Sequence, residues 1–300
     1  MNIQDTPGRA DAVAELLVGA VDLHCHSGPA AFPRRIDHRD AMKDAEAAGF
    51  EALVYKDHFY PGMAHATLLQ TLYPDEKVKV YSGVALNNAN GGINPFAVDH
   101  AVKLNGKIVW MPTFSAKNHI DKSQTETKNY PKSDKPMLEQ IPLTVLDEND
   151  RLTEATQQVL DVIAAGDIIL AGGHLNVREL KILFAEAKKR GVKKMLVNHP
   201  TYVIGCEDDD MVELAKMGVF MEHSVCMLID CRARRHEPDD LARLINLVGV
   251  DSTIMGSDLG LMNMPLPIEG FREIVSILLD LQFSEADIRK LIGGNAGSLI

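Results

Sequence analysis

The sequence predicts a distorted (β/α)8 barrel of the TIM type that forms one domain over residues 1–300. Two observations indicate this fold. Short apolar runs typical of buried strands alternate with helical patterns along the chain, which is the order expected of a parallel sheet. The chain also has 300 residues with 46% hydrophobic content, which is enough for one barrel with a well-buried core.

Eight short apolar runs predict the strands, and eight strand–helix units in one chain are the number that closes such a barrel. In chain order the predicted strands are Ala20–His24, Glu51–Lys56, Lys77–Leu86, Lys107–Met111, Asp167–Ala171, Lys194–Asn198, Val219–Glu222 and Ser252–Gly256.

Start and stop signals predict the helices between these strands. Pro95 opens one helix, Asn176 and Glu179 have the spacing of a capping box, and Gly49 and Gly166 follow helix ends where a left-handed residue is favoured. The predicted helices are Arg9–Val18, His38–Ala48, Pro95–Leu104, Leu152–Ala165, Asn176–Arg190, Glu207–Lys216 and Pro238–Leu247, with two more after the last strand.

One segment interrupts this alternation. Residues 115–150 follow the fourth strand and are polar, rich in Lys, Asp, Asn and Pro, with no clear helical period. A loop of this length inside a compact domain is usually functional or mobile. We expect this insertion to cover the active-site rim or to contact a neighbouring subunit, and the alternative is a surface excursion without a catalytic role.

Composition and charge exclude several functions. The net charge of −11 disfavours binding to a phosphate backbone, so no nucleic-acid partner is expected. No apolar stretch reaches membrane-spanning length, and charged residues interrupt the first twenty positions, so neither a membrane span nor a signal peptide is predicted. The cysteines show no CxxC spacing, and a cytoplasmic protein with reduced thiols is expected. They are Cys25, Cys206, Cys226 and Cys231.

Metal-binding side chains recur where the predicted strands end. His24 and His26 are two apart on one strand, so they share a face while Cys25 points away. His174 and His199 follow later strands, and Asp258 follows the eighth. The strand ends of a parallel barrel meet at one rim, so these five side chains predict a divalent metal site. Nitrogen ligands with one carboxylate suit Zn, Mn or Fe.

These residues resemble the amidohydrolase superfamily of metal-dependent barrel hydrolases, in the same order and over essentially the whole chain. The C-terminal run from Leu291 to Ile300 also looks like the final helix segment common in that superfamily. The resemblance implies that the metal ligands are His24, His26, His174, His199 and Asp258. It also implies that Asp258 accepts the proton of the attacking water.

One position departs from the superfamily pattern. Binuclear members usually have a carboxylated lysine or a glutamate at the end of the fourth strand, and the run from Ile108 to Phe114 has neither. Lys56, at the end of the second strand, could supply the bridging group if carboxylated. Alternatively, Lys56 pairs with Asp57 or with a substrate carboxylate. The sequence therefore leaves open whether one or two ions bind.

Other polar or flexible side chains near the rim are predicted to shape the substrate pocket. They are His58, Asn87, His119, Glu222, His223 and Met262.

The ligand set predicts a hydrolase that uses metal-activated water to cleave an amide, lactone or ester of a small molecule. Asp258, His199 and Lys56 are the predicted catalytic residues. Alternatives are a decarboxylase of the same superfamily and a PHP-type phosphoesterase, although the late Asp-x-His pair usual in the latter is missing at Asp258. A non-catalytic barrel with a structural metal is a third alternative. A homo-oligomer is expected, since homodimers are the commonest assembly of soluble enzymes.

Overall fold

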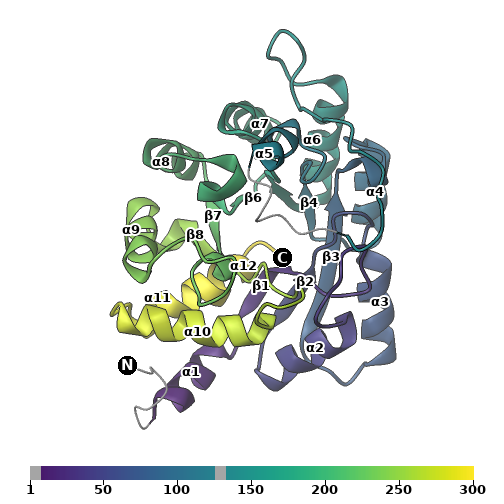
Figure 1. The fold of residues 1–300 in the computed structure, drawn as a ribbon. Helices are drawn as coiled ribbons and strands as arrows, with labels where there is room; N and C mark the ends of the chain where they lie inside the picture. The colour runs from purple at the N-terminus through teal and green to yellow at the C-terminus, as the bar shows by residue number, and fades with distance from the viewer. Residues whose placement is uncertain (1–7, 126–132) are drawn as a thin grey trace.

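The computed structural model describes residues 8–125 and 133–300 and contains a sheet of eight parallel strands, ordered β1 to β8 as in the chain. Helices surround the strands on the outside (Figure 1). The predicted (β/α)8 barrel is therefore confirmed. The strands are β1 (Val21–Cys25), β2 (Ala52–Tyr55), β3 (Lys79–Ala85), β4 (Ile108–Trp110), β5 (Ile169–Ala171), β6 (Met195–Asn198), β7 (Val219–Ser224) and β8 (Thr253–Gly256).

Every helix predicted from the sequence is present, and the structure adds further ones. The helices are α1 (Arg9–Leu17), α2 (His38–Ala47), α3 (Met63–Leu72), α4 (Pro95–Lys103), α5 (Lys117–Thr125), α6 (Glu154–Gly166), α7 (Val177–Lys189), α8 (Asp208–Lys216), α9 (Pro238–Val248), α10 (Pro267–Asp280), α11 (Glu285–Arg289) and α12 (Asn295–Gly297).

Helix α3 was not predicted because its sequence lacks the usual signals. Gly62 precedes it and supplies no side-chain cap. Apolar residues lie on more than one side of the helix, so that Leu68 and Leu72 are 56% and 60% exposed. The pattern therefore has no clear polar face, which is the signal that identifies a surface helix.

Helix α5 corrects the expectation that residues 115–150 have no helix. Most of its residues are polar, so packing of an apolar stripe does not hold it in place. Instead, the side-chain amide of Asn118 donates hydrogen bonds of 3.0 Å to the carbonyls of His174 and Val203. These tertiary contacts are invisible in the local pattern. Residues 126–132 of the same segment lie outside the described residues.

Apolar side chains fill the inside of the barrel. One buried cluster contains Leu23, Val54, Trp110, Leu196 and Ile254, which come from strands around the whole sheet. Two further clusters lie between the strands and the surrounding helices. The barrel is thus a packed core, and a pocket can form only above it, at an end of the strands.

The barrel closes between β8 and β1 with help from a side chain. Cys25 and Leu259 form an isolated parallel bridge there. The buried carboxylate of Asp22 accepts hydrogen bonds of 2.9 Å from the backbone N–H groups of His24 and Ser257. The Asp258 N–H donates to the carbonyl of His24 at 2.9 Å. This irregular seam brings the ends of β1 and β8 together.

None of the helices in the described ranges is both long enough and apolar enough to cross a membrane. All four cysteines lie in the described residues and are free thiols.

A buried carboxylate holds the end of the insertion against α7. Glu179 caps its own helix by accepting a hydrogen bond from the Asn176 N–H at 3.1 Å. Its other oxygen accepts from the Thr144 hydroxyl at 2.6 Å and from the Val145 N–H at 3.3 Å. The loop and the helix are therefore joined by one side chain.

We predict that Glu179→Ala lowers the free energy of unfolding by about 2–3 kcal/mol, because it removes a helix cap and leaves the buried Val145 N–H unpaired. Urea denaturation would measure the change. The matched control Lys189→Ala, on the same helix and 73% exposed, should change stability by less than about 0.5 kcal/mol. Equal stability of the two variants would contradict this role of Glu179.

Candidate metal centre

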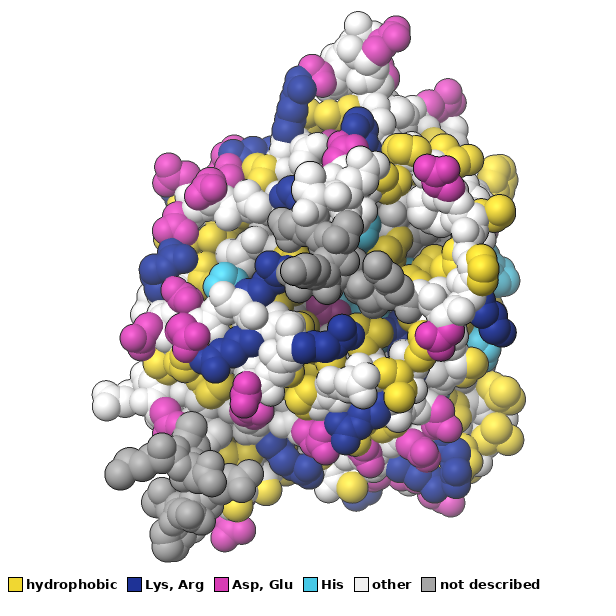
Figure 2. Space-filling view, viewed as in Figure 1, with side chains coloured by type: hydrophobic (Ala, Val, Ile, Leu, Met, Phe, Trp, Pro, Cys, Tyr) yellow, Lys and Arg dark blue, Asp and Glu magenta, His cyan; other side chains and the backbone are white. Residues whose placement is uncertain are grey.

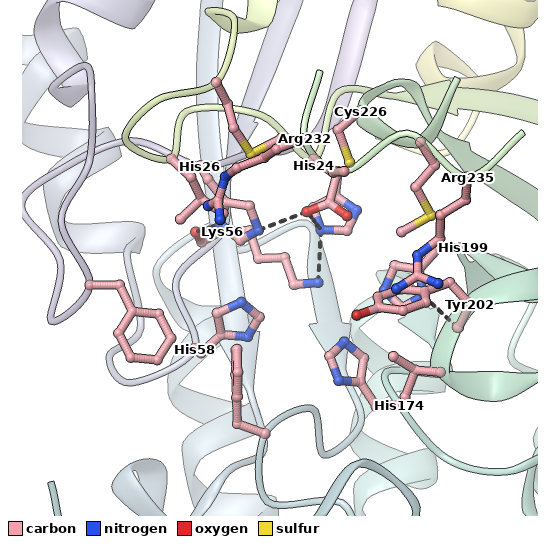
Figure 3. Close-up of a pocket in the computed structure, with 18 of the residues that line it drawn as sticks. His24, His26, Lys56, His58, His174, His199, Tyr202, Cys226, Arg232 and Arg235 are labelled. Carbon is pink, nitrogen blue, oxygen red and sulfur yellow. Dashed lines mark hydrogen bonds and ion pairs between the residues drawn. The ribbon is translucent and has the colours of Figure 1, made fainter. Parts of the chain in front are cut away.

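A pocket of about 390 Å³ lies at the carboxyl ends of the strands, and a ring of histidines lines it. Figure 3 shows His58, His174 and His199 pointing into a common space below His24 and His26. This is the rim on which the sequence placed the metal ligands. The predicted site residues that line the pocket are His24, His26, Lys56, His58, His119, His174, His199 and Asp258.

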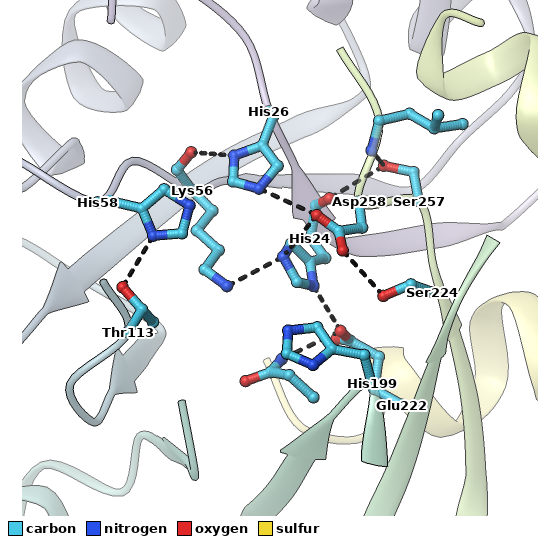
Figure 4. A network of polar contacts seen from close by, with 12 residues as sticks. His24, His26, Lys56, His58, Thr113, His199, Glu222, Ser224, Ser257 and Asp258 are labelled. Atoms are coloured by element: carbon cyan, nitrogen blue, oxygen red, sulfur yellow. Dashed lines mark hydrogen bonds and ion pairs between the residues drawn. The ribbon is translucent and has the colours of Figure 1, made fainter. Parts of the chain in front are cut away.

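Three of these side chains lie close enough together to hold a metal ion, and they are called the ligand group below. One ligand atom from each of His24, His26 and Asp258 lies within 4.8 Å of the others. Asp258 Oδ1 is 3.3 Å from His24 Nε2 and 3.2 Å from His26 Nε2 (Figure 4). Two strands, β1 and β8, thus bring two imidazole nitrogens and one carboxylate oxygen to one point.

The Nδ1 atoms of His24 and His26 (the outer nitrogens) already form hydrogen bonds. These bonds determine whether the Nε2 atoms (the inner nitrogens) present a proton or a lone pair to the pocket. His26 Nδ1 lies 2.9 Å from the carbonyl oxygen of Lys56, which can only accept, so Nδ1 donates. His24 Nδ1 likewise donates to the carboxylate of Glu222 at 2.6 Å. In its neutral form, each ring would therefore present a lone pair on Nε2 toward Asp258. Three electron-rich atoms facing one another fit a bound cation, and a hydrogen-bonded second layer is typical of metal-binding histidines.

Asp258 is held by its backbone and by a neighbouring strand. Its φ of 50° is left-handed, and Ser224 at the end of β7 donates a hydrogen bond of 3.1 Å to its Oδ2. Burial raises the pKa of this carboxyl, but the charge that His24 and His26 carry when protonated lowers it more strongly, so that its pKa lies well below the usual range. The side chain is 17% exposed and faces the pocket as a carboxylate.

Lys56 approaches the ligand group from β2. Its Nζ lies 3.0 Å from His24 Nε2 and 5.4 Å from the centre of the Trp110 ring. The predicted alternative, an ion pair between Lys56 and Asp57, is not formed, because successive residues at a strand end point in opposite directions. The Asp57 carboxylate lies instead 3.7 Å from Arg34.

The remaining histidines form the far side of the ring. His174 and His199 have ring centres 5.0 Å apart. His199 Nδ1 donates to the carbonyl of Tyr202 at 3.2 Å, which leaves its Nε2 lone pair free to bind a ligand. The Nδ1 atoms of His174 and His119 are 2.7 Å apart, so helix α5 contributes a pocket residue. His119, from the segment predicted to cover the rim or to contact a neighbouring subunit, thus lines the pocket.

Burial controls the protonation of these side chains, because removing a group from water disfavours its charged form. The pKa of His26 falls to about 3 through burial, with a further contribution from the nearby charge of Arg34. Burial lowers the pKa of His119 and of His199 to about 4. It also lowers the pKa of Lys56 to about 8.

Four residues predicted to shape the substrate pocket are not among its lining residues. Asn87 and Glu222 are fully buried and contact residues near the pocket. Asn87 accepts a hydrogen bond from the Thr113 N–H at 2.8 Å, and Glu222 accepts one from His24. His223 follows Glu222 on β7 and therefore points to the opposite face of the strand. Met262 is 45% exposed, lies in the loop after β8 and lines a different pocket.

Several side chains of the site escaped the sequence reasoning. Arg34 lines the pocket with a side chain that is only 4% exposed. Ser224 holds Asp258, and Asn198 donates to Glu222 at 3.0 Å. Only Arg34 had a signal in the sequence. It lies in the loop after the first strand, and the rim loops of a barrel usually contain its binding residues. The hydrogen bonds of Ser224 and Asn198 have no local signature.

Comparison with known proteins places the chain in a family. A family model described as a family of unknown function, DUF6282, matches residues 19–222. The chain belongs to the DUF6282 family. A search of curated proteins finds no match for this DUF6282 protein.

Solved structures share its fold at low sequence identity. An amidohydrolase from Pseudomonas aeruginosa is 12% identical with a TM-score of 0.67, covering 97% of each chain. The probable dipeptidase PvdM from the same species is 11% identical with a TM-score of 0.67, covering 98% of each chain. An organophosphorus hydrolase from Deinococcus radiodurans is 12% identical with a TM-score of 0.56, covering 96% of this chain and 93% of that one. The resemblance found in the sequence is thus confirmed at the level of the fold.

We predict that Glu222→Gln weakens zinc binding about 10- to 100-fold, because the amide holds the His24 ring less firmly and adds less electron density to it than the carboxylate does. Competition with a chelating dye would measure the dissociation constant. The control Glu285→Gln changes an exposed glutamate of α11 and should leave zinc affinity unchanged. An unaltered affinity in Glu222→Gln would show that Glu222 does not support a metal ligand.

Proposed function

We propose that this DUF6282 protein is a metal-dependent hydrolase of small molecules, with His24, His26 and Asp258 holding one divalent ion. The supporting observation is the convergence of His24 Nε2, His26 Nε2 and Asp258 Oδ1 at the pocket, with the outer ring nitrogens engaged elsewhere. The fold likeness to an amidohydrolase and an organophosphorus hydrolase agrees with this chemistry. Zinc suits the donor set, and Mn or Fe are alternatives.

Held by these residues, a divalent ion would supply a water molecule with a pKa lowered toward neutrality and would polarise a substrate carbonyl. Asp258 is in position to move the proton, because Ser224 holds Oδ2 while the carboxylate faces the pocket. It accepts a proton from water and returns it to the leaving nitrogen or oxygen, which is general acid–base catalysis. The scissile bond is proposed to be an amide, lactone or ester.

We further propose that Lys56, His174 and His199 form the second half of the site. Lys56 Nζ lies 3.0 Å from His24 Nε2, close enough for a carboxylated side chain to reach the same ligand group. His199 presents its Nε2 lone pair beside His174, with His119 behind it. These residues would hold a second ion or orient the substrate carbonyl. His58, hydrogen-bonded to Thr113 at 2.8 Å, would form the adjoining wall of the substrate pocket.

The setting of the enzyme is part of the proposal. The four free cysteines agree with a reducing compartment, so we place the protein in the cytoplasm. The net charge of −11 agrees with a small-molecule substrate and with the absence of a nucleic-acid partner. A homo-oligomer is expected on general grounds.

Elemental analysis of the purified protein tests the metal site. We predict one to two equivalents of divalent metal in the wild type and a loss of at least half of it in Asp258→Ala, because one of three ligands is removed. The exposed control Asp251→Ala, whose side chain is 82% accessible, should keep the full metal content.

Lys56→Ala separates the one-ion and two-ion forms of the site. A fall from two equivalents to one would support a bridged pair and hydrolysis. One equivalent in both proteins would favour a single ion and the decarboxylase alternative. Preparations without stoichiometric metal would overturn the metal-dependent mechanism.

We predict that Asp258→Asn lowers kcat/KM about 100-fold or more on a panel of p-nitrophenyl esters and lactones, even when the metal is restored, because the amide cannot accept the proton. Asp251→Asn serves as the control and should retain activity. Transfer of ¹⁸O from labelled water to the product would identify hydrolysis, whereas release of carbon dioxide without label would identify decarboxylation. Full activity of zinc-loaded Asp258→Asn would refute the assigned role.

A further inference from the structure

The pocket contains a buried cation that the proposed reaction does not use. Arg34 lines the pocket from the loop after β1, and its side chain is 4% exposed. Its Nε and Nη2 atoms are buried without a hydrogen-bond partner among the described residues. A guanidinium has five N–H donors and stays charged, so burying it without acceptors is costly. Such an arrangement is typical of a group kept ready for an anionic ligand.

Asp57 neutralises Arg34 without satisfying it. The Arg34 Nη2 to Asp57 Oδ2 distance is 3.7 Å, which is beyond hydrogen-bond length, and Oδ2 is also unpartnered within the described part of the chain. The other oxygen of Asp57 is engaged, since it accepts from the Phe59 N–H at 2.7 Å. The guanidinium therefore keeps donors that no described residue satisfies, while the charge of Asp57 disfavours a dianion more than a monoanion.

The charge of the pocket differs from that of the whole chain. Although the net charge is −11, the described residues lining the pocket include four arginines, and Asp258 is the one carboxylate among them. Arg232 and Arg235 lie at the pocket in Figure 3, with Arg235 stacked 3.9 Å from the Tyr202 ring centre. Basic side chains also lie across the middle of the face in Figure 2. This distribution would steer anions to the site.

The wall next to Arg34 is apolar. Phe32, two residues before it, packs edge to face on Phe114 with ring centres 5.3 Å apart, and both line the pocket. Phe114 in turn packs against His58 at 4.4 Å. At about 390 Å³, the pocket lies at the small end of the range for ligand sites. A compact molecule with one anionic end and an apolar body matches these surfaces.

We propose that Arg34 binds a substrate carboxylate, so that the enzyme acts on small monocarboxylic acids whose apolar part lies against Phe32 and Phe114. This inference rests on the proposed function, because it names the substrate class for the same pocket. The forked guanidinium matches the two oxygens of a carboxylate. The scissile bond then faces Asp258 and the histidines that line the pocket. Arg232 and Arg235 attract the acid to the entrance of the pocket.

Calorimetric titration with benzoate and its neutral counterpart benzamide tests the proposal without requiring turnover. We expect the wild type to bind benzoate, and Arg34→Gln to weaken that binding about 10- to 100-fold, the loss typical of hydrogen bonds to a charged group. Benzamide should bind equally to both proteins. The control Arg39→Gln removes an arginine of α2 that is 50% exposed and does not line the pocket, so benzoate affinity should not change.

Arg34→Gln leaves Asp57 buried without a counter-charge and could fail to fold. The double variant Arg34→Gln/Asp57→Asn removes both charges and should show the same loss of benzoate affinity. Equal benzoate affinity in the wild type and the double variant would overturn the proposal. So would a wild type that does not bind benzoate. Inorganic phosphate binding more tightly than benzoate, with the same dependence on Arg34, would assign a phosphoryl substrate instead.

Titrations of chelator-treated and zinc-loaded protein separate this proposal from the proposed function. Arg34 is not in the ligand group, so Arg34→Gln should bind zinc as the wild type does. A wild type that fails to bind zinc but discriminates benzoate from benzamide through Arg34 would refute the metal mechanism and leave the carboxylate site standing. Normal zinc binding with equal affinity for benzoate and benzamide would refute the carboxylate site and leave the metal site standing.

Discussion

The imidazole of His24 is the point on which the site depends, because it joins four strands at the rim of the barrel. Glu222 of β7 holds its outer nitrogen at 2.6 Å, and its inner nitrogen meets Asp258 after β8 and Lys56 after β2. A hydrogen bond to a buried carboxylate fixes the tautomer of such a ring and its orientation. The ring is thereby held with its lone pair directed into the pocket.

The irregular seam between β1 and β8 makes this geometry available. Asp22 accepts the backbone N–H groups of His24 and Ser257, and Asp258 donates its own N–H to the His24 carbonyl. The two ends are thus joined by polar contacts of both main chain and side chain. The left-handed backbone of Asp258 then directs its carboxylate toward His24 and His26. The same contacts therefore close the barrel and bring the side chains of the ligand group together.

The pocket combines two regions of different chemistry above this group. Histidines and Asp258 form the polar side, where the proposed proton transfer would take place. Arg34, Phe32 and Phe114 form a side that is cationic at one end and apolar at the other. Because apolar side chains fill the described barrel interior, we propose that substrate binds in this space at the rim. In the proposed function, reaction and recognition would thus occupy adjacent parts of one rim.

The sequence by itself determined the barrel and the metal-type residues at its strand ends. Strand and helix patterns are local, and a side chain at the end of a parallel strand lies at the rim wherever the strand is placed. The position of His24, His26 and Asp258 at the rim could therefore be predicted from the sequence. Tertiary structure alone decided which partners complete them. Asn118 anchors α5, Glu222 orients His24, and Arg34 lies buried beside Asp57. These contacts join residues far apart in the chain or set by loop geometry, and no local periodicity encodes them.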